Sequence, residues 1–238
     1  MKFYRRLQSV AALSFDLDDT LYSNRPIMLN TEKQMLAYFS EHFPQTAEQG
    51  DQACRQYWRQ FRQQALNEQP HLVHDVTALR LQNYKLAIKA LGYSDSISQQ
   101  KAHAAFDYFT HHRSDFTLPI ASKNLLEKLA LKFPLVAITN GNVNFEKLGL
   151  TSFFQQIYNP GNGIKRKPDS EMFHNACHQL QIKPAQLLHV GDCGNSDIVG
   201  ALNAGCQAAW LNRYTVGKPI SVLPHVELSS LDNLLYLL

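Results

Sequence analysis

A short apolar run that ends in a cluster of carboxylates constrains this chain more than any other feature. Residues 10–13 are apolar and predict a buried strand, and Asp16, Asp18 and Asp19 follow where that strand should end. Carboxylates this close repel one another, so a bound cation is the usual means of offsetting their cost beside a core. In an extended segment Asp16 and Asp18 point to the same side, which lets both approach one Mg²⁺ ion, or one side chain and one backbone carbonyl. The alternative at this point is an aspartate-rich turn that caps the strand.

Composition excludes several classes of protein. The chain has 238 residues, 45% of them hydrophobic, which allows one large domain or two small ones. The formal net charge is only +3 and shows no basic stripe, so no nucleic-acid partner is expected. No apolar run is long enough to span a bilayer, and no signal peptide is expected. The cysteines Cys54, Cys177, Cys193 and Cys206 form no Cys-x-x-Cys pair, and we expect reduced thiols in a cytoplasmic monomer.

The segment from Ile27 to Arg113 predicts successive helices without an intervening strand. The expected helices span residues 28–43, 46–68, 75–91 and 98–112. We expect them to form a small bundle with its own core, in which most of the aromatic side chains pack. His71 and His74 lie between two of these helices, where they could face an active site.

From Pro119 onward the sequence alternates between apolar strands and amphipathic helices, which is typical of a parallel, doubly wound α/β sheet. Strands are expected at residues 134–139, 154–158, 187–190 and 206–211, and helices at residues 121–131, 143–150, 169–181, 196–204 and 231–238. The helical segment is therefore an insertion in an α/β core. The expected boundaries are residues 1–22 and 115–238 for the core and residues 23–114 for the insertion.

Polar residues follow several expected strands at the point where each strand ends. Asp16 follows the first strand, Thr139 ends the strand at residues 134–138, and Asp192 follows the strand at residues 187–190. Ligands of open α/β sheets bind beyond the carboxyl ends of the strands, so we expect these side chains to converge. Taken singly, Thr139 is equally compatible with an ordinary Asn-Gly turn.

Four motifs, in order along the chain, resemble those of the haloacid dehalogenase (HAD) superfamily of phosphotransferases. They are Asp16-x-Asp18-x-Thr20, Thr139-Asn140-Gly141, Lys167-Pro168, and Gly191-Asp192 followed by Asp197. The resemblance implies a Rossmann-like core with an inserted helical cap of the C1 type, a Mg²⁺ cofactor and a small-molecule phosphomonoester substrate. The metal ligands that it implies are Asp16, Asp18 and Asp192. Without the resemblance, the Lys167 run is an exposed basic turn.

The resemblance also implies a role for each motif residue. Asp16 becomes the nucleophile of an aspartyl-phosphate mechanism, and Asp18 becomes the acid and base. The groups expected to hold the phosphoryl oxygens are Thr139, Asn140, Gly141 and Lys167. Lys167 also keeps Asp16 ionised, and Asp197 orients Lys167 or an outer-shell water. The cap is expected to close over the site, exclude water and contact the leaving group.

Shorter stretches resemble a bacterial group of flavin mononucleotide phosphatases, also described as 5-amino-6-(5-phospho-D-ribitylamino)uracil phosphatases of riboflavin biosynthesis. These stretches include residues 3–5, 24–26, 74–77 and 223–225. They imply flavin mononucleotide (FMN) or the phosphoribitylamino-uracil as substrate, with Tyr22 as the first residue to test for ring stacking; packing at the hinge is its alternative role.

Other functions stay open at this point. A phosphatase with broad specificity for sugar phosphates or nucleotides shares the four motifs, and so does a phosphomutase. A phospholigand-binding protein on the same fold is the alternative without catalysis. Asp18 argues against a dehalogenase, which lacks an acid at that position. Cys193 stands where the family has a small polar residue, which suggests sensitivity to oxidation.

Overall fold

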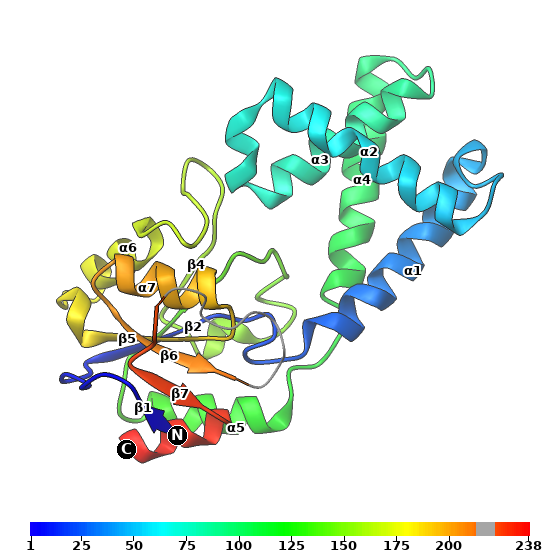
Figure 1. The fold of residues 1–238 in the computed structure, drawn as a ribbon. Coiled ribbons are helices and arrows are strands. Elements are labelled where there is room, and N and C mark those ends of the chain that lie inside the picture. The colour runs from blue at the N-terminus through cyan, green and yellow to red at the C-terminus, as the bar shows by residue number, and fades with distance from the viewer. Residues whose placement is uncertain (213–221) are drawn as a thin grey trace. The chain divides into compact units, whose positions relative to one another are not determined.

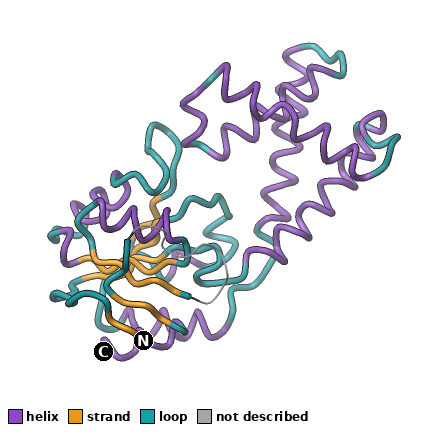
Figure 2. The backbone as a smooth tube through the Cα atoms, viewed as in Figure 1, coloured by secondary structure: helices purple, strands orange, loops and turns teal. Residues whose placement is uncertain are grey.

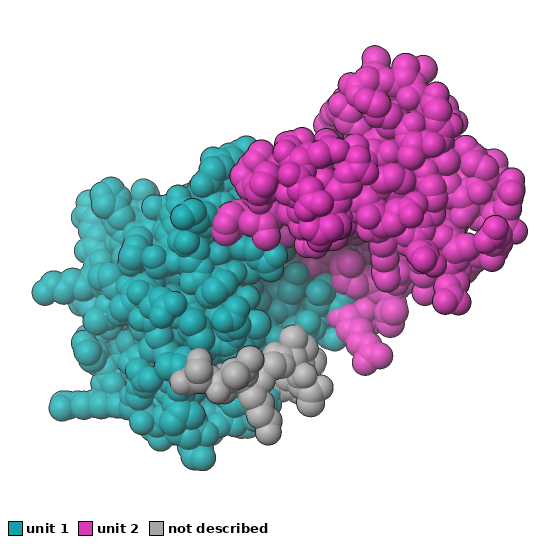
Figure 3. Space-filling model, turned by 45° about the horizontal axis from the view of Figure 1, so that its top comes forward, with its two compact units in different colours: residues 1–24, 117–141, 145–238 teal, residues 25–116, 142–144 magenta. Residues whose placement is uncertain are grey.

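The computed structural model describes residues 1–212 and 222–238. It separates into two compact units, which Figure 3 draws in different colours. Unit 1 comprises residues 1–24, 117–141 and 145–238, and unit 2 comprises residues 25–116 and 142–144. The three residues directly after Gly141 therefore group with the helical unit, although no sequence pattern indicated this.

Unit 1 is built on a sheet with the strand order β1-β7-β6-β5-β2-β3-β4, counted over the described residues. The strands are β1 Lys2–Phe3, β2 Ala12–Phe15, β3 Leu135–Ile138, β4 Gln156–Tyr158, β5 Leu187–Gly191, β6 Gln207–Leu211 and β7 Val226–Leu228. All neighbouring pairs are parallel except β1 with β7, which confirms the predicted α/β class. The pattern missed β1 and β7 because segments of two or three residues show no periodicity.

Helices cover both faces of this sheet (Figure 1). The helical elements of unit 1 are α5 Ile120–Ala130, η3 Leu150–Ser152, α6 Glu171–Gln179, η4 Pro184–Gln186, η5 Gly194–Val199, α7 Gly200–Asn203 and η6 Leu231–Leu237. Figure 1 shows α6 and α7 on one face, and α5 with η6 on the other. Between the sheet and α6, a core that includes Ile138, Met172 and Phe173 excludes solvent completely. Its burial fixes the strand ends that carry the polar residues.

The helix predicted for residues 143–150 is wrong. This segment forms turns up to η3. The backbone amide of Asn144 donates to the Ser114 hydroxyl at 2.8 Å, and Gly149 adopts a left-handed φ of 66°. A polar partner from outside the segment and a left-handed residue near its end both compete with a regular helix.

Unit 2 is a helical bundle, and Figure 2 colours its helices purple. Its elements are α1 Asn24–His42, η1 Pro44–Thr46, α2 Asp51–Glu68, η2 Pro70–His74, α3 Val76–Ala90 and α4 Asp95–Arg113. Asp75 and Ser94 cap α3 and α4 through their side-chain oxygens. The Phe39 and Trp58 rings stack at 3.8 Å in its core. None of the helices in the described part of the chain is long and apolar enough to cross a membrane.

Candidate active site

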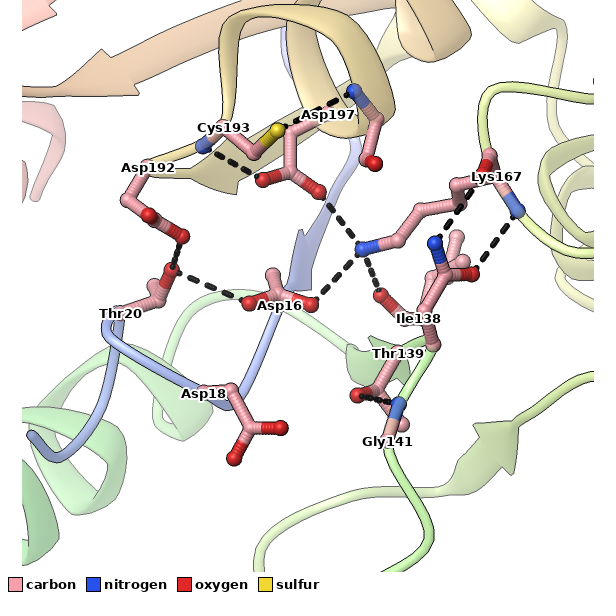
Figure 4. Close-up of polar contacts among 12 residues, drawn as sticks. Asp16, Asp18, Thr20, Ile138, Thr139, Gly141, Lys167, Asp192, Cys193 and Asp197 are labelled. Carbon is pink, nitrogen blue, oxygen red and sulfur yellow. Dashed lines mark hydrogen bonds and ion pairs between the residues drawn. The ribbon is translucent and has the colours of Figure 1, made fainter. Parts of the chain in front are cut away.

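Three strands of unit 1 bring the predicted polar residues to one edge of the sheet (Figure 4). Asp16 follows β2, whose last residue Phe15 is paired with Ala137 of β3 on one side and with Val190 of β5 on the other. The residues that follow β3 and β5 therefore lie beside Asp16. Thr139, Asp192 and Asp16 are all buried, at 1%, 4% and 7% exposure. The site is thus built where parallel strands end together.

Lys167 is the cation of this site and is almost completely buried. Its ammonium donates to Asp16 Oδ1 at 2.8 Å, to Asp197 Oδ1 at 2.6 Å and to the Ile138 carbonyl. An ammonium has three N–H groups, and all three are used. Burial alone would lower the pKa of Lys167, but the carboxylates of Asp16 and Asp197 outweigh it and raise the pKa above its ordinary value. Lys167 is therefore a fixed positive charge beside Asp16.

The Asn140 side chain holds the backbone of Lys167. Its amide nitrogen donates to the Lys167 carbonyl at 3.0 Å, and its oxygen accepts from the Lys167 backbone N–H at 2.8 Å. Sequence reasoning assigned Asn140 to the phosphoryl group, and nothing in the sequence indicates this partner 27 positions away. Two hydrogen bonds from one planar amide leave the chain at Lys167 little freedom to rotate. Asn140 thus positions Lys167 from the end of β3.

The carboxylates of Asp16, Asp192 and Asp197 form a buried cluster whose ligand atoms lie within 4.8 Å of one another. The Thr20 hydroxyl lies 3.4 Å from Asp16 Oδ2 and 3.3 Å from Asp192 Oδ1. One hydroxyl carries one proton and can satisfy only one of these oxygens at a time. Burial, with the charges of Asp197 and Asp19, raises the pKa of Asp192 to about 7. This excess of buried anionic oxygen fits a hard divalent cation.

Asp197 differs from the other two acids because its oxygens already have partners. Oδ2 accepts from the Cys193 backbone N–H at 2.9 Å, and Oδ1 accepts from Lys167 and from His189 Nε2, the latter at 3.2 Å. Although burial opposes it, Lys167 and His189 lower the pKa of Asp197. Within this cluster, Asp16 and Asp192 are therefore the side chains that can approach a cation, whereas Asp197 is paired with Lys167.

The carboxyl group of Asp18 lies between the Tyr22 hydroxyl and Gly141. The Tyr22 hydroxyl donates to Asp18 Oδ1 at 2.8 Å, and a Cβ built on Gly141 would lie 2.8 Å from Asp18 Oδ2. Tyr22 is 3% exposed. The structure therefore places its hydroxyl on Asp18, a contact that the sequence did not indicate. The Thr139 hydroxyl accepts from the Gly141 N–H at 3.0 Å, which shapes the turn beside Asp18.

Two buried polar residues of interest were not selected from the sequence. Ser14 and His189 lie inside the apolar strands β2 and β5 and are fully buried. The only indication in the sequence was that each is a polar residue within an apolar run.

The structure also locates the other residues that the sequence singled out. Cys193 is half-buried, and its sulfur accepts from the Ser196 N–H at 3.4 Å, in the position that a helix-capping oxygen usually takes. His71 and His74 belong to η2 of unit 2.

The sequence is similar to those of several known hydrolases. A family model described as haloacid dehalogenase-like hydrolase matches residues 10–205. The chain is 37% identical to 5-amino-6-(5-phospho-D-ribitylamino)uracil phosphatase YigB of Escherichia coli strain K12, over 98% of each protein. It is 27% identical to the N-acylneuraminate-9-phosphatase of Rattus norvegicus, over 96% of this chain and 93% of that protein. A crystal structure of 2-haloacid dehalogenase from Pseudomonas syringae pv. Tomato DC3000 has a TM-score of 0.87 at 30% identity, over 95% of this chain and 97% of that chain.

The chain therefore belongs to the haloacid dehalogenase-like hydrolase family and is a phosphoric monoester hydrolase. The family model covers the strand-end site from Asp16 to Asp197 and the helical unit between its first two motifs. The resemblance that the four motifs indicated is confirmed.

Two glycines of this site give a contrasting pair of predictions. A Cβ on Gly191 would overlap the carboxyl carbon of Asp197, whereas a Cβ on Gly141 would meet the end of the Asp18 side chain and, less closely, the Thr139 hydroxyl. Gly191→Ala is expected to lower kcat about 100-fold and to destabilise the fold by about 2 kcal/mol, because Asp197 must move away from Lys167. Gly141→Ala is expected to lower kcat about tenfold with little change in Tm. Phosphate release and thermal unfolding measure both. A Gly191→Ala enzyme with wild-type kcat would contradict this account.

Proposed function

We propose that the enzyme is a Mg²⁺-dependent phosphatase that works through an aspartyl phosphate on Asp16. The observation that supports this is the ion pair between Asp16 and the buried Lys167, beside carboxylates that lack a matching positive charge. Burial raises the pKa of Asp16, and Lys167 opposes that rise. A neighbouring cation would favour the ionised, nucleophilic form further. The substrate proposed is FMN or the phosphoribitylamino-uracil precursor of riboflavin.

The first half of the reaction transfers the phosphoryl group to Asp16. The Asp16 carboxylate attacks phosphorus, a new P–O bond forms, and the bond to the leaving alcohol breaks. Asp18 gives its proton to the leaving oxygen. Lys167 acts by its charge, since its three N–H groups are used. The Thr139 hydroxyl, which accepts from the Gly141 N–H, still has its own proton to donate to a phosphoryl oxygen.

The second half returns the enzyme to its starting state. Asp18, now ionised, takes a proton from water, and the water attacks phosphorus of the aspartyl phosphate. Inorganic phosphate leaves, and Asp16 is again a carboxylate. Tyr22 keeps the Asp18 carboxyl oriented through both halves, because its hydroxyl donates to Oδ1.

The residues that would hold Mg²⁺ are Asp16, Asp18 and Asp192. All offer oxygen, which suits Mg²⁺ and disfavours Zn²⁺. When bound, the cation would neutralise charge on the phosphoryl oxygens as a Lewis acid. Trp210 supports this set by donating from its indole nitrogen to the Asp192 carbonyl at 2.8 Å, which fixes the backbone that carries the ligand.

Removal of metal should abolish activity. We expect no phosphate release in the presence of a chelator and full recovery on adding excess Mg²⁺. Mg²⁺ at 100 times its Kd should also raise the free energy of unfolding by about 2.7 kcal/mol, a gain that Asp192→Asn removes.

Metal binding should also depend on pH. Because Asp192 has a pKa of about 7, protons should compete with Mg²⁺ increasingly as the pH falls below that value. The control is Asp107→Asn, an exposed carboxylate of α4. Full activity without metal would contradict the assignment.

The substrate proposal rests on the relative from Escherichia coli, which matches nearly the whole chain and is named for a phosphoribitylamino-uracil. In such a compound a primary phosphate sits on a flexible polyol, and the flat heterocycle can stack on aromatic side chains. The rival class is the sugar phosphates, because another similar protein is named as an N-acylneuraminate-9-phosphatase.

A comparison of kcat/KM tests the substrate class. The compounds are FMN, 5-amino-6-(5-phospho-D-ribitylamino)uracil, ribose 5-phosphate and N-acylneuraminate 9-phosphate. We expect the two heterocyclic compounds to exceed both sugar phosphates by at least about tenfold, since a buried ring contributes more than 1.4 kcal/mol. Higher kcat/KM for a sugar phosphate would overturn the riboflavin-precursor assignment.

Release of halide from 2-chloropropionate tests for dehalogenase activity. We expect no halide release, because Asp18 provides an acid for an alcohol leaving group.

A further inference from the structure

A chain of buried hydrogen bonds runs beneath the nucleophile and starts at a serine that sequence reasoning had passed over. Ser14 Oγ lies 2.9 Å from His189 Nδ1, and His189 Nε2 lies 3.2 Å from Asp197 Oδ1. The same oxygen of Asp197 accepts from Lys167, which in turn donates to Asp16. Ser14 is paired with His189 in the register of β2 and β5, and it lies two residues before Asp16. The contacts therefore form a chain that begins on β2 at Ser14 and returns to Asp16, directly after the end of β2.

The chemistry of its members sets the direction of each hydrogen bond. Asp197 is ionised and can only accept, so His189 Nε2 must carry a proton. Burial, with the nearby charge of Lys167, lowers the pKa of His189 to about 4. The imidazole is therefore neutral and carries only the proton on Nε2. His189 Nδ1 is then an acceptor, and the Ser14 hydroxyl must donate to it. One arrangement of protons satisfies every member.

Burial leaves no replacement for a lost member. Ser14 and His189 have no exposed surface, and Asp197 and Lys167 are each 1% exposed. The His189 ring also packs edge-on against Phe173 with centroids 5.0 Å apart, which limits its rotation. Water cannot readily enter to take over a broken hydrogen bond, so the orientation of Asp197 depends on these partners.

We propose that Ser14 and His189 are positioning residues for the nucleophile, acting through Asp197 on Lys167. The proposal rests on the function proposed above. With His189 in place, Asp197 Oδ1 is directed by two donors and Oδ2 by the Cys193 N–H. Without His189, the Asp197 carboxylate turns toward its remaining partners, and Lys167 no longer holds Asp16 in a single orientation. The lost orientation slows the chemical steps and leaves substrate binding nearly unchanged.

The experiment compares His189→Leu, His189→Gln and Ser14→Ala with the wild type. Gln can still donate from its amide toward Asp197, whereas Leu cannot. We expect His189→Leu to lower kcat by about 10- to 100-fold with KM within about twofold, and His189→Gln to recover most of the loss. Ser14→Ala should lower kcat by about threefold. The control is His174→Gln. His174 is on α6, and its ring contacts the Ala204 carbonyl and takes no part in the hydrogen bonds described here. It should keep wild-type kcat.

A second readout separates this proposal from the proposed function. In ¹H–¹⁵N spectra, His189 should carry its proton on Nε2 at pH 7, and the Lys167 ammonium should show slow proton exchange because all its N–H groups are bonded. The Lys167 signal should be lost in His189→Leu and return in His189→Gln. These spectra require no turnover, so they decide the proposal even if the wild type releases no phosphate. A proton on Nδ1, an unchanged Lys167 signal in His189→Leu, or kcat of that variant within twofold of the wild type overturns it.

Discussion

Asp16→Asn is expected to lower kcat by at least about ten-thousand-fold while the protein stays folded. The amide has the shape of the carboxylate, and its oxygen can still accept from Lys167, but it is not a nucleophile toward phosphorus. The change also removes one negative charge from a buried cluster of three carboxylates and one ammonium. Tm should therefore stay at or above the wild-type value. Phosphate release and thermal unfolding measure the two expectations.

Asp18→Asn provides the matched comparison. This variant keeps the nucleophile, so a substrate with a good leaving group should still phosphorylate Asp16, while hydrolysis of the intermediate stalls. The expected signature is a burst of one leaving group per enzyme followed by almost no turnover. Mass spectrometry of a digest should find the phosphate on Asp16. Phosphate on any other residue, or steady turnover by Asp16→Asn, would refute the mechanism.

Lys167→Met is expected to cost both activity and stability. Met fills most of the volume of the side chain but leaves Asp16 and Asp197 buried without their cation. Breaking a buried ion pair in this way costs about 3–5 kcal/mol, which corresponds to a fall in Tm of about 10 °C for a chain of this size. Turnover should vanish with it, because the charge that holds Asp16 ionised is gone.

A double variant tests whether charge is the cause. Asp16→Asn in the Lys167→Met background removes one of the two stranded carboxylates, so the double variant should be more stable than Lys167→Met alone. Lys165→Met is the surface control: its side chain is 56% exposed and its ammonium lies 3.8 Å from Asp169, so Tm and kcat should stay at wild-type values. Equal stability of Lys167→Met and the double variant would show that packing, and not charge, accounts for the loss.

Local pattern predicted which polar residues lie together at the strand ends, and the reason is physical. A buried parallel strand is a continuous apolar run, and the polar residue that ends it is visible in the sequence, as at Asp16, Thr139 and Asp192. Because parallel strands end at one edge, order along the chain translates into proximity in space. The same reasoning failed at residues 143–150, where the partner of Asn144 is Ser114, a residue 30 positions earlier.

The sequence by itself determined the α/β class, the helical insertion and the acids that follow the strands, because these depend on periodicity and on residue chemistry. Only the tertiary structure decided which groups pair. It placed the Asn140 amide on the Lys167 backbone, the Tyr22 hydroxyl on Asp18, and His189 between Ser14 and Asp197. Each of these hydrogen bonds depends on where two groups meet to within a few tenths of an ångström. The bonds of Asn140 with Lys167 and of Ser14 with His189 also join segments distant in the sequence. No pattern of residue types carries that information.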